Sequence, residues 1–334
     1  MAGKKRKQTK VARVAPRVVA IVGSQSYLGA GLAERLASDP TIERVVAVDL
    51  RPPRTVPPRM IFRRVDLTRP SADQELADVL AVEAVDTIVH LAFFASPIHN
   101  AAYAHELEAI GTLHVLSAAA AAGVERVVVQ STTTVYGAHR KNPNLLTEEH
   151  PVRGSPQSRF ITDKVEAEKQ VLRWAREHDE VELSVLRFAP VVGPSVKNLF
   201  ERYLTRPVAP MVAGFDPLIQ ALHQADALDA LELAVRKGPR GVFNVAPHGV
   251  LPLTTALRLC GAQPLPLPGP LAAAALQGLR AAGVTPTPAS MLDYLRFGWV
   301  ADGGKFEREL GFTPRYNTRE AIVALSERAR RAAA

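Results

Sequence analysis

Short, almost wholly apolar segments alternate along the chain with longer segments in which apolar and polar residues follow a helical period. The first apolar segment is 18–22 (Val-Val-Ala-Ile-Val), and the amphipathic segment after it covers 28–37. Strands that are apolar throughout are typical of parallel sheets covered by helices on both faces. The fold class is therefore α/β, a Rossmann-type doubly wound parallel sheet. The same pattern predicts strands at 44–48, 61–65, 87–91, 126–130 and 183–188, and helices at 72–81, 100–122 and 159–178.

The regular alternation weakens after residue 190, where prolines become frequent, above all at 263–270. We expect three parts: a disordered basic tail at 1–16, an NAD(P)-binding Rossmann domain at 17–188, and a smaller C-terminal α/β substrate-binding lobe at 189–334, interleaved with it. The Ala- and Leu-rich stretch 271–282 predicts a helix that faces the core, with a helix that binds a partner or a membrane surface as the alternative.

The positive charge is concentrated near the N-terminus. The chain has 41 Lys and Arg against 33 Asp and Glu, a net charge of +8, and seven of the basic residues precede residue 18. The first acidic residue is Glu34, so the remainder of the chain is close to neutral. A basic run of this kind is usually a solvated arm. Contact with nucleic acid or an anionic membrane is therefore expected through the tail alone, if at all.

Composition gives no sign of a membrane or secreted protein. Mean hydropathy is +0.01, and no apolar run approaches the roughly 20 residues that a membrane-spanning helix needs. The first residues lack the apolar core of a secretory signal. The single cysteine, Cys260, can form no internal disulfide and gives no metal-site spacing, so we expect no metal. A cytoplasmic setting follows as the expectation.

A glycine-containing turn joins the first predicted strand to the first predicted helix, in the order Gly23-Ser24-Gln25-Ser26-Tyr27-Leu28-Gly29. Gly23 permits a tight turn, and Gly29 permits close packing of helix and strand. Ser26 stands where a third glycine often lets the backbone approach a pyrophosphate. The amides at the helix start, at Tyr27 and Leu28, would face the phosphates. This segment predicts a dinucleotide site.

An acidic residue follows at the expected distance. Asp49 ends the second predicted strand, about 20 residues after the glycine turn. A carboxylate there accepts hydrogen bonds from the ribose hydroxyls and repels a 2′-phosphate, which favours NAD over NADP. Arg51 lies two residues further on and could instead hold that phosphate, so NADP stays open as the alternative.

Further landmarks follow in the order of one family. They are Asp66-Leu67, His90-Leu91-Ala92, Gly111-Thr112, the segment 131–137 that ends in Val-Tyr-Gly, Arg187, His223 and Asp226. From residue 17 onward the chain resembles the extended short-chain dehydrogenases/reductases of the NAD-dependent epimerase/dehydratase type. The resemblance implies that Asp66 and Leu67 contact the adenine, and that Leu91 and Ala92 lie beside the cofactor. The chain departs from the family pattern at Glu108, where the family has asparagine.

The resemblance also implies a set of catalytic residues: a Ser or Thr hydroxyl at Thr132, a lysine at Lys164 and a tyrosine four residues before that lysine. The lysine holds the nicotinamide ribose and lowers the pKa of the tyrosine, which moves a proton at the reacting oxygen. This chain has Phe160 at the tyrosine position. Phenylalanine can neither donate nor accept a proton.

Three interpretations remain open. In the first, catalysis has been lost and the chain is a dinucleotide-binding module that acts through a partner or senses the cofactor. In the second, another side chain moves the proton. In the third, Lys164 or water sustains a slow reaction. We favour an NAD-dependent redox or isomerase reaction on a hydroxyl or carbonyl substrate, with atypical acid–base chemistry. Candidate substitutes are His99 and Tyr103, with Ser96, Tyr136 and His139 also considered; Tyr136 is more typical of a structural residue.

The substrate is expected to be a small molecule other than a typical UDP-sugar. Nucleotide-sugar members of the family usually have an arginine where this chain has Ile219, and often an asparagine at the position of Pro190. Arg202, Arg206 or Arg296 could replace that arginine. A lobe rich in Leu, Ala and Pro is compatible with a less polar substrate, such as a lipid or a sterol-like alcohol. A homodimer is compatible with the sequence.

Overall fold

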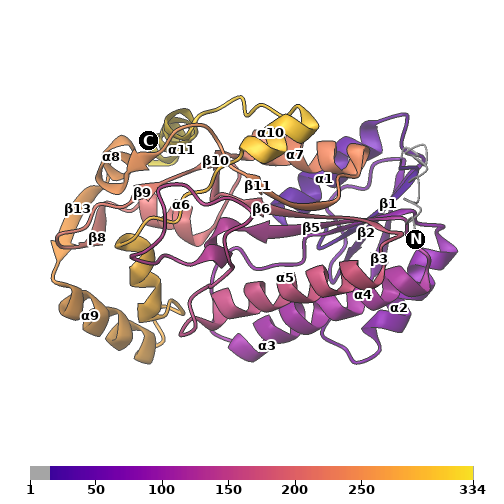
Figure 1. The fold of residues 1–334 in the computed structure, drawn as a ribbon, viewed down its shortest axis with the longest axis horizontal. Helices are drawn as coiled ribbons and strands as arrows, with labels where there is room; N and C mark the ends of the chain where they lie inside the picture. The colour runs from indigo at the N-terminus through magenta and orange to yellow at the C-terminus, as the bar shows by residue number, and fades with distance from the viewer. Residues whose placement is uncertain (1–15, 334) are drawn as a thin grey trace, which may run out of the picture.

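A seven-stranded parallel sheet forms the centre of the molecule (Figure 1). The computed structural model describes the backbone of residues 16–333 and the side chains of residues 16–327, so the predicted tail, apart from its last residue, lies outside the described residues. The strand order is β11-β6-β5-β4-β1-β2-β3, and each neighbouring pair is parallel. The order reverses beside β1, which confirms the predicted doubly wound fold. The strands are β1 (Val18–Val22), β2 (Arg44–Asp49), β3 (Met60–Arg64), β4 (Thr87–His90), β5 (Arg126–Thr132), β6 (Glu182–Phe188) and β11 (Gly241–Val245).

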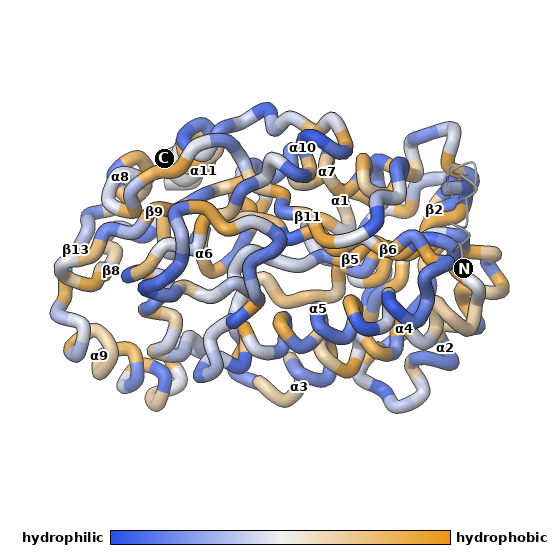
Figure 2. Tube along the Cα trace, viewed as in Figure 1, coloured by the Kyte–Doolittle hydropathy of each residue, from blue (hydrophilic) through white to orange (hydrophobic). Residues whose placement is uncertain are grey.

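Helices cover both faces of this sheet, and the strand side chains alternate between them. Val18, Ala20 and Val22 pack with the helices on one face, whereas Val19 and Ile21 pack with those on the other. Figure 2 shows the resulting apolar centre between more polar outer surfaces. The first face carries α2 (Ala72–Val82), α4 (Gly111–Ala121) and α5 (Arg159–Glu177), and the second carries α1 (Tyr27–Ser38) and α7 (Gln224–Lys237).

The helix predicted at 100–122 contains a π-helical turn. It forms as α3 (Ala101–His105), a π turn at Glu106–Ile110, and α4. A π turn inserts one extra residue into a helix and frequently occurs at functional sites. Here it contains Glu108, which is 1% exposed.

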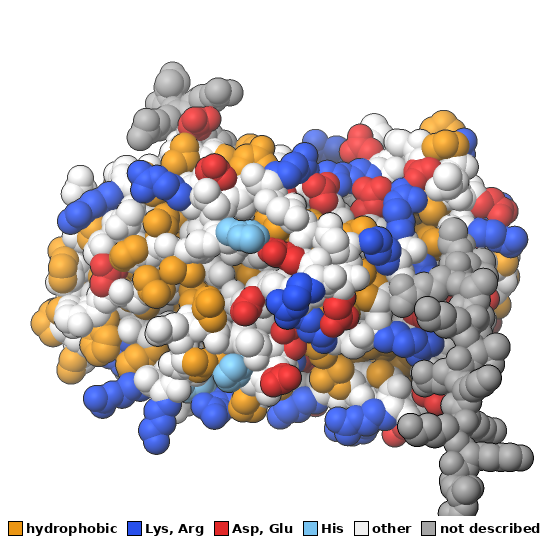
Figure 3. Space-filling model, turned by 45° about the horizontal axis from the view of Figure 1, so that its top comes forward, with side chains coloured by type: hydrophobic (Ala, Val, Ile, Leu, Met, Phe, Trp, Pro, Cys, Tyr) orange, Lys and Arg blue, Asp and Glu red, His pale blue; other side chains and the backbone are white. Residues whose placement is uncertain are grey.

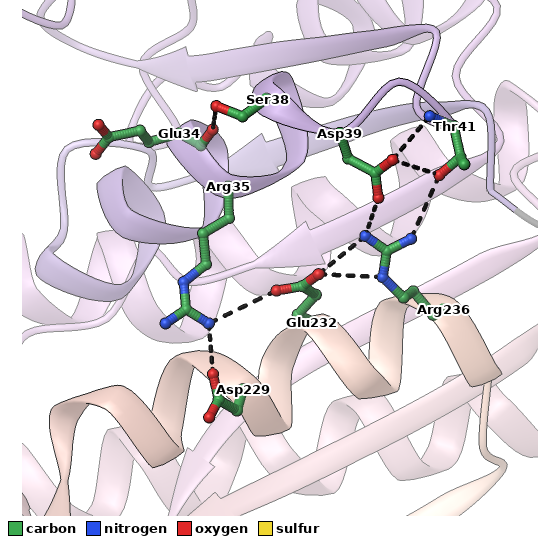
Figure 4. A network of polar contacts seen from close by, with 8 residues as sticks. All are labelled: Glu34, Arg35, Ser38, Asp39, Thr41, Asp229, Glu232 and Arg236. Carbon is green, nitrogen blue, oxygen red and sulfur yellow. Dashed lines mark hydrogen bonds and ion pairs between the residues drawn. The ribbon is translucent and has the colours of Figure 1, made fainter.

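Ion pairs fix helix α7 against helix α1 (Figure 4). Arg35 of α1 pairs with Asp229 at 2.6 Å and lies 3.6 Å from Glu232. Arg236 of α7 bonds Glu232 at 2.9 Å and also pairs with Asp39, just beyond the end of α1. Such partly exposed pairs are individually weak, but a network of them restrains geometry more than one pair does. Although α7 comes from the C-terminal part of the chain, it therefore supports the helix that begins at the glycine turn.

The C-terminal lobe is built from three small two-stranded sheets and short helices. Its core contains Leu204, Met211, Leu257 and Ile322. The seventh sheet strand, β11, also comes from this part of the chain and was not predicted. The other elements are β7 (Val191–Val192), α6 (Leu199–Leu204), β8 (Val208–Val212), β9 (Leu218–Ile219), β10 (Leu222–His223), β12 (Leu251–Pro252), α8 (Leu253–Leu259), β13 (Gln263–Leu267), α9 (Gly269–Ala281), α10 (Gly304–Leu310) and α11 (Thr318–Ala333), with 3₁₀ turns at Thr133–Tyr136 and Ala289–Leu295.

The Ala- and Leu-rich helix is present as α9, but the prediction that it faces the core is wrong. Ala272 is its one buried residue, while Leu271 is 56% and Leu279 is 47% exposed. Composition predicts the helix because Ala and Leu favour it, yet it does not determine what covers the helix. Among the described residues, no helix is both long and apolar enough to cross a membrane.

Buried His90 predicts a specific acid sensitivity. Its Nε2 lies 3.0 Å from the Thr112 hydroxyl, and burial lowers the pKa of the imidazole from 6.5 to about 3. Below pH 6.5 the unfolded chain takes up a proton that the folded chain cannot, so stability falls as the pH drops from 6.5 towards 3. Between pH 7 and 4.5 this group should cost on the order of 2 kcal/mol.

Urea unfolding of the wild type and His90→Gln at both pH values measures this difference. The variant should lose less stability on acidification. Equal losses in the two proteins would show that His90 titrates normally.

Candidate active site

The glycine turn has a conformation that larger residues cannot adopt. Gly23 has φ +86°, and a Cβ on it would lie 2.6 Å from the backbone of Leu91 and Ala92. A Cβ on Gly29 would lie 2.3 Å from the Gly23 carbonyl oxygen. Both distances are shorter than any real carbon contact. The turn therefore brings the start of α1 directly against the end of β4, as the sequence motif predicts.

The N-terminus of α1 presents unpaired amides. The Ser26 hydroxyl accepts a hydrogen bond from the Gly29 amide at 3.0 Å and so caps the helix. Within the described residues, the amides of Tyr27 and Leu28 have no acceptor. Free N–H groups and the positive end of the helix dipole fit a pyrophosphate, the central group of NAD.

The end of β2 supplies a carboxylate beside this turn. One oxygen of Asp49 accepts from the Gln25 amide at 2.9 Å, and the other accepts from the Leu50 amide at 2.7 Å. The Asp49 side chain stays half-exposed, with lone pairs left for ribose hydroxyls. Arg51 is exposed and forms no ion pair with the described side chains. At the end of β3, Asp66 accepts from the Thr68 amide and hydroxyl, and Leu67 is buried.

Replacement of Asp49 should weaken NAD binding selectively. Asp49→Asn removes the charge while keeping the shape, and hydrogen bonds to a charged group are worth about 1.5–3 kcal/mol, or roughly 10- to 100-fold in affinity. The preference for NAD over NADP should shrink as well, because the repulsion of a 2′-phosphate is lost.

Quenching of protein fluorescence on titration with NADH and NADPH measures both effects. Asp78→Asn, an exposed change on α2, is the matched control and should bind as the wild type does. Unchanged affinity in Asp49→Asn would remove Asp49 from the cofactor site.

A cavity of about 960 Å³ extends from the start of α1 into the C-terminal lobe. Ser26, Tyr27 and Leu28 line it at the dinucleotide turn, Thr132 lines it at the end of β5, and Lys164 lines it from the second turn of α5. The side chains that line the remainder are mainly apolar, and they include Phe188, Phe200, Met211, Leu276, Leu295 and Trp299. The residues predicted to hold a cofactor thus open into an apolar chamber.

Thr132 offers a free hydroxyl proton to this cavity. Its Oγ1 accepts from the Thr134 amide at 3.3 Å and from the Thr134 hydroxyl at 3.2 Å. Its own O–H has no acceptor among the described residues. A hydroxyl in this state can donate a hydrogen bond to an oxygen of a bound molecule.

Lys164 is held by a buried carboxylate. Its Nζ donates to Glu108 Oε1 at 2.8 Å and to the Phe94 carbonyl at 2.9 Å. The same Glu108 oxygen accepts from the Phe94 amide at 2.7 Å. Burial raises the pKa of the Glu108 carboxyl, and the Lys164 ammonium partly opposes that shift. The ring of Phe160 lies 4.6 Å from Nζ, so an aromatic face covers the cation.

The candidate substitutes for a tyrosine occupy different places. His99 is exposed and lines the cavity. Ser96 and Tyr103 do not line it; burial raises the pKa of Tyr103, and the charges of Asp66 and Asp49 add to that shift. His139 lines a separate small cavity.

Tyr136 belongs to a buried polar network. It is 1% exposed, and its hydroxyl donates to Asn244 at 2.8 Å and accepts from Arg187 at 2.7 Å. Arg187 also binds both oxygens of Glu168, which in turn accepts from Ser131, the neighbour of Thr132. Ser131 and Glu168 line the cavity, whereas Tyr136, Arg187 and Asn244 lie behind them. The network therefore supports the cavity wall beside Thr132.

Of the residues that the sequence analysis connects with the substrate, all but Arg296 line the cavity. Ile219 and Pro190 line the cavity, as do Arg202 and Arg206. Arg296 does not line it and pairs with Asp293 at 3.2 Å. Arg202 and Arg206 are therefore the two of these arginines that both line the cavity and are exposed.

The match to a family model decides what kind of protein this is. Residues 19–246 match the NAD dependent epimerase/dehydratase family. The chain belongs to this family. NAD is accordingly its cofactor, and the amides at α1 and the carboxylate of Asp49 fit that group. An uncharacterized protein of Mycobacterium tuberculosis (Rv0501) is 35% identical over 315 residues, which are 92% of this chain and 82% of that protein.

Two other proteins are similar to this chain at lower sequence identity. The 3beta-hydroxysteroid dehydrogenase/Delta(5)-Delta(4) isomerase 1 of Caenorhabditis elegans is 29% identical over 169 residues, 49% of this chain and 35% of that protein. The dTDP-glucose 4,6-dehydratase of Bacillus anthracis in complex with NAD has a similar fold, with a TM-score of 0.71 at 16% identity over 94% of this chain and 97% of that one.

Sequence reasoning missed the partner of Lys164. The departure from asparagine at Glu108 was visible, and so was Phe160, but nothing in their spacing showed that the two meet at one lysine.

Among the described side chains, His105, Asp163 and Glu166 form a group with metal-ligand chemistry. The Arg159 guanidinium already lies 3.3 Å from Asp163, which opposes binding of a cation there.

Proposed function

We propose that this protein transfers hydride between NAD and the carbon of a hydroxyl or carbonyl group on a largely apolar substrate, without the family's catalytic tyrosine. The observation that carries the proposal is the cavity, which joins Thr132 and Lys164 to an apolar chamber in the C-terminal lobe. NAD supplies the hydride chemistry. The free O–H of Thr132 is placed to donate to the substrate oxygen and to hold it in position.

His99 is our candidate for proton exchange. Among the substitutes considered it is the one that lines the cavity, and histidine is the side chain most often used for this purpose. The absence of an arginine at Ile219 and the apolar lining argue for a substrate other than a UDP-sugar. Arg202 and Arg206 would face any polar end that the substrate leaves at the opening.

The test combines cofactor binding with a substrate screen. The full chain is incubated with NAD and apolar secondary alcohols, including a 3β-hydroxysteroid, with UDP-glucose as the polar comparator, and NADH is followed by absorbance. We expect turnover of an apolar alcohol. Thr132→Ala should lower kcat about 10²-fold. Preferred turnover of UDP-glucose would contradict the proposed substrate class, and failure to bind NADH would contradict the site itself.

His99 has its own comparison in the same assay. His99→Gln should lower kcat by about 10² while leaving NADH binding unchanged. His178→Gln, which alters a histidine stacked on Trp174, is the control. Equal rates in the wild type and His99→Gln would leave His99 without a role in proton transfer.

A second function is favoured by one contact. The Lys164–Glu108 ion pair under the Phe160 ring leaves the lysine with its charge already compensated. A chain that binds NAD without turning it over, and acts through a partner or as a sensor of the cofactor, would need no free lysine. In that case the screen finds tight NADH binding and no substrate.

A further inference from the structure

Helix α9 has few polar side chains for a helix at the surface. Its cavity side is formed by Ala272, Leu276 and Leu279. Its exposed residues include Pro270, Leu271, Ala274 and Ala281, and the polar side chains among them are Gln277 and Arg280 alone. A surface helix ordinarily presents a stripe of charged residues to water, and an exposed helix this apolar is usually covered.

The exposed apolar surface continues beyond α9. Leu265 of β13 is 46% exposed, and Val284, just after α9, is 68% exposed. Figure 1 places β13 and α9 together at the end of the molecule far from the N-terminus, and Figure 3 shows hydrophobic side chains gathered at that end. We call the surface formed by Leu265, Leu271, Leu279 and Val284 the apical face.

The unpaired charges of this region are positive. From residue 262 to residue 292 the single charged side chain is Arg280, and Asp293, just beyond, pairs with Arg296. Arg202 and Arg206 line the cavity, and Arg206 lies over the ring of Tyr203. Among the described side chains, none of Arg202, Arg206 and Arg280 pairs with a carboxylate.

The apical face adjoins the cavity. Leu279 and Val284 belong to both, since they line the cavity and are exposed. Any apolar molecule entering the chamber at this point would pass between apolar side chains and arginines.

We infer that the apical face docks on the surface of an anionic lipid bilayer, from which the apolar substrate of the proposed function enters the cavity. Apolar side chains inserted below the headgroups, with arginines at the level of the phosphates, are the features of an interfacial membrane-binding surface. A second copy of the chain fits less well. A two-fold contact through this face would bring the same unpaired arginines of both copies together.

The experiment is co-sedimentation of the full chain with vesicles of phosphatidylcholine alone or mixed with phosphatidylglycerol. Leu265→Asp/Leu271→Asp removes two apical side chains that do not line the cavity. Burial of one leucine is worth about tenfold in binding, so the partition coefficient should fall at least tenfold. Val56→Asp/Val82→Asp changes two valines elsewhere that are at least half exposed, adds the same charge and should bind as the wild type does. The basic N-terminal residues are identical in all three proteins.

The remaining outcomes are also decisive. Arg202→Gln/Arg206→Gln should weaken binding to the phosphatidylglycerol vesicles, by about fivefold for each arginine, but not binding to phosphatidylcholine. Equal partition of the two aspartate variants would overturn the inference. So would a wild-type dimer that Leu265→Asp/Leu271→Asp dissociates. Vesicle binding is measured without turnover, so its failure is distinguishable from failure of the proposed reaction.

Discussion

Phe160→Tyr alone should leave the rate of NAD reduction within about tenfold of the wild type, whereas Phe160→Tyr/Glu108→Asn should raise it by about 10²–10⁴-fold. The reason is the position of Glu108. A phenol at residue 160 would stand beside a lysine whose charge is compensated by a carboxylate at 2.8 Å. That pair would do little to favour the phenolate. Replacement of the carboxylate by the family's asparagine leaves Lys164 as a cation beside the new tyrosine.

The measurement is kcat for the alcohol found in the screen, or the same screen repeated with both variants where the wild type turns over none, with NADH binding and thermal unfolding as controls. Glu108→Asn alone should lose stability, because it leaves a buried ammonium with one partner fewer, and should gain no activity. Tyrosinate absorbance during a pH titration gives an independent readout. The new phenol should ionise at lower pH in the double variant than in Phe160→Tyr. Coincident titrations in the two variants would contradict the proposed influence of Glu108.

Under the alternative function, the double variant is the one that acquires activity. A wild type that binds NAD without turnover, together with an active double variant, would identify an epimerase/dehydratase scaffold that lost catalysis through these two positions. Measurable turnover in the wild type that depends on His99 would instead identify a rerouted proton transfer. The same set of proteins therefore separates the two functions.

Local pattern was sufficient to predict six of the seven strands of the sheet and the dinucleotide turn. Strands such as β1 are apolar at every position and bounded by turn residues, and a strand, a glycine turn and a helix follow each other within the first 40 residues. The chemistry of Gly23 and Asp49 depends on neighbours nearby in sequence or on the adjacent strand. Such contacts are set by the fold itself, so a motif that predicts the fold also predicts them.

The features on which the proposed reaction depends are contacts between residues distant in sequence. Glu108 meets Lys164 across 56 residues, by way of a π turn that no hydrophobic period indicates. The direction in which α9 faces depends on how the lobe packs, because an Ala- and Leu-rich helix is equally compatible with a core, a partner or a bilayer. The chamber is likewise formed by residues from many separate segments. None of these follows from spacing along the chain.

Arg187→Met should destabilise the folded protein by about 3–5 kcal/mol, the cost of leaving a buried carboxylate without its partner. Arg187 and Glu168 are each 3% exposed, and the guanidinium binds both carboxylate oxygens as well as the Tyr136 hydroxyl. Water has little access to solvate Glu168 once the arginine is removed. The midpoint of urea unfolding, compared with that of Arg176→Met, an exposed change on α5, measures the loss.

The paired variant Arg187→Met/Glu168→Leu distinguishes a charge effect from a packing effect. Removal of both charges should recover most of the stability, because buried ion pairs replaced by apolar residues are often neutral or better. Ser131 would then lose its carboxylate acceptor, and it lies next to Thr132 at the end of β5. The recovered protein should therefore bind NADH normally but turn over substrate more slowly. A paired variant as unstable as Arg187→Met would mean that packing around the guanidinium, and not its charge, stabilises this buried network.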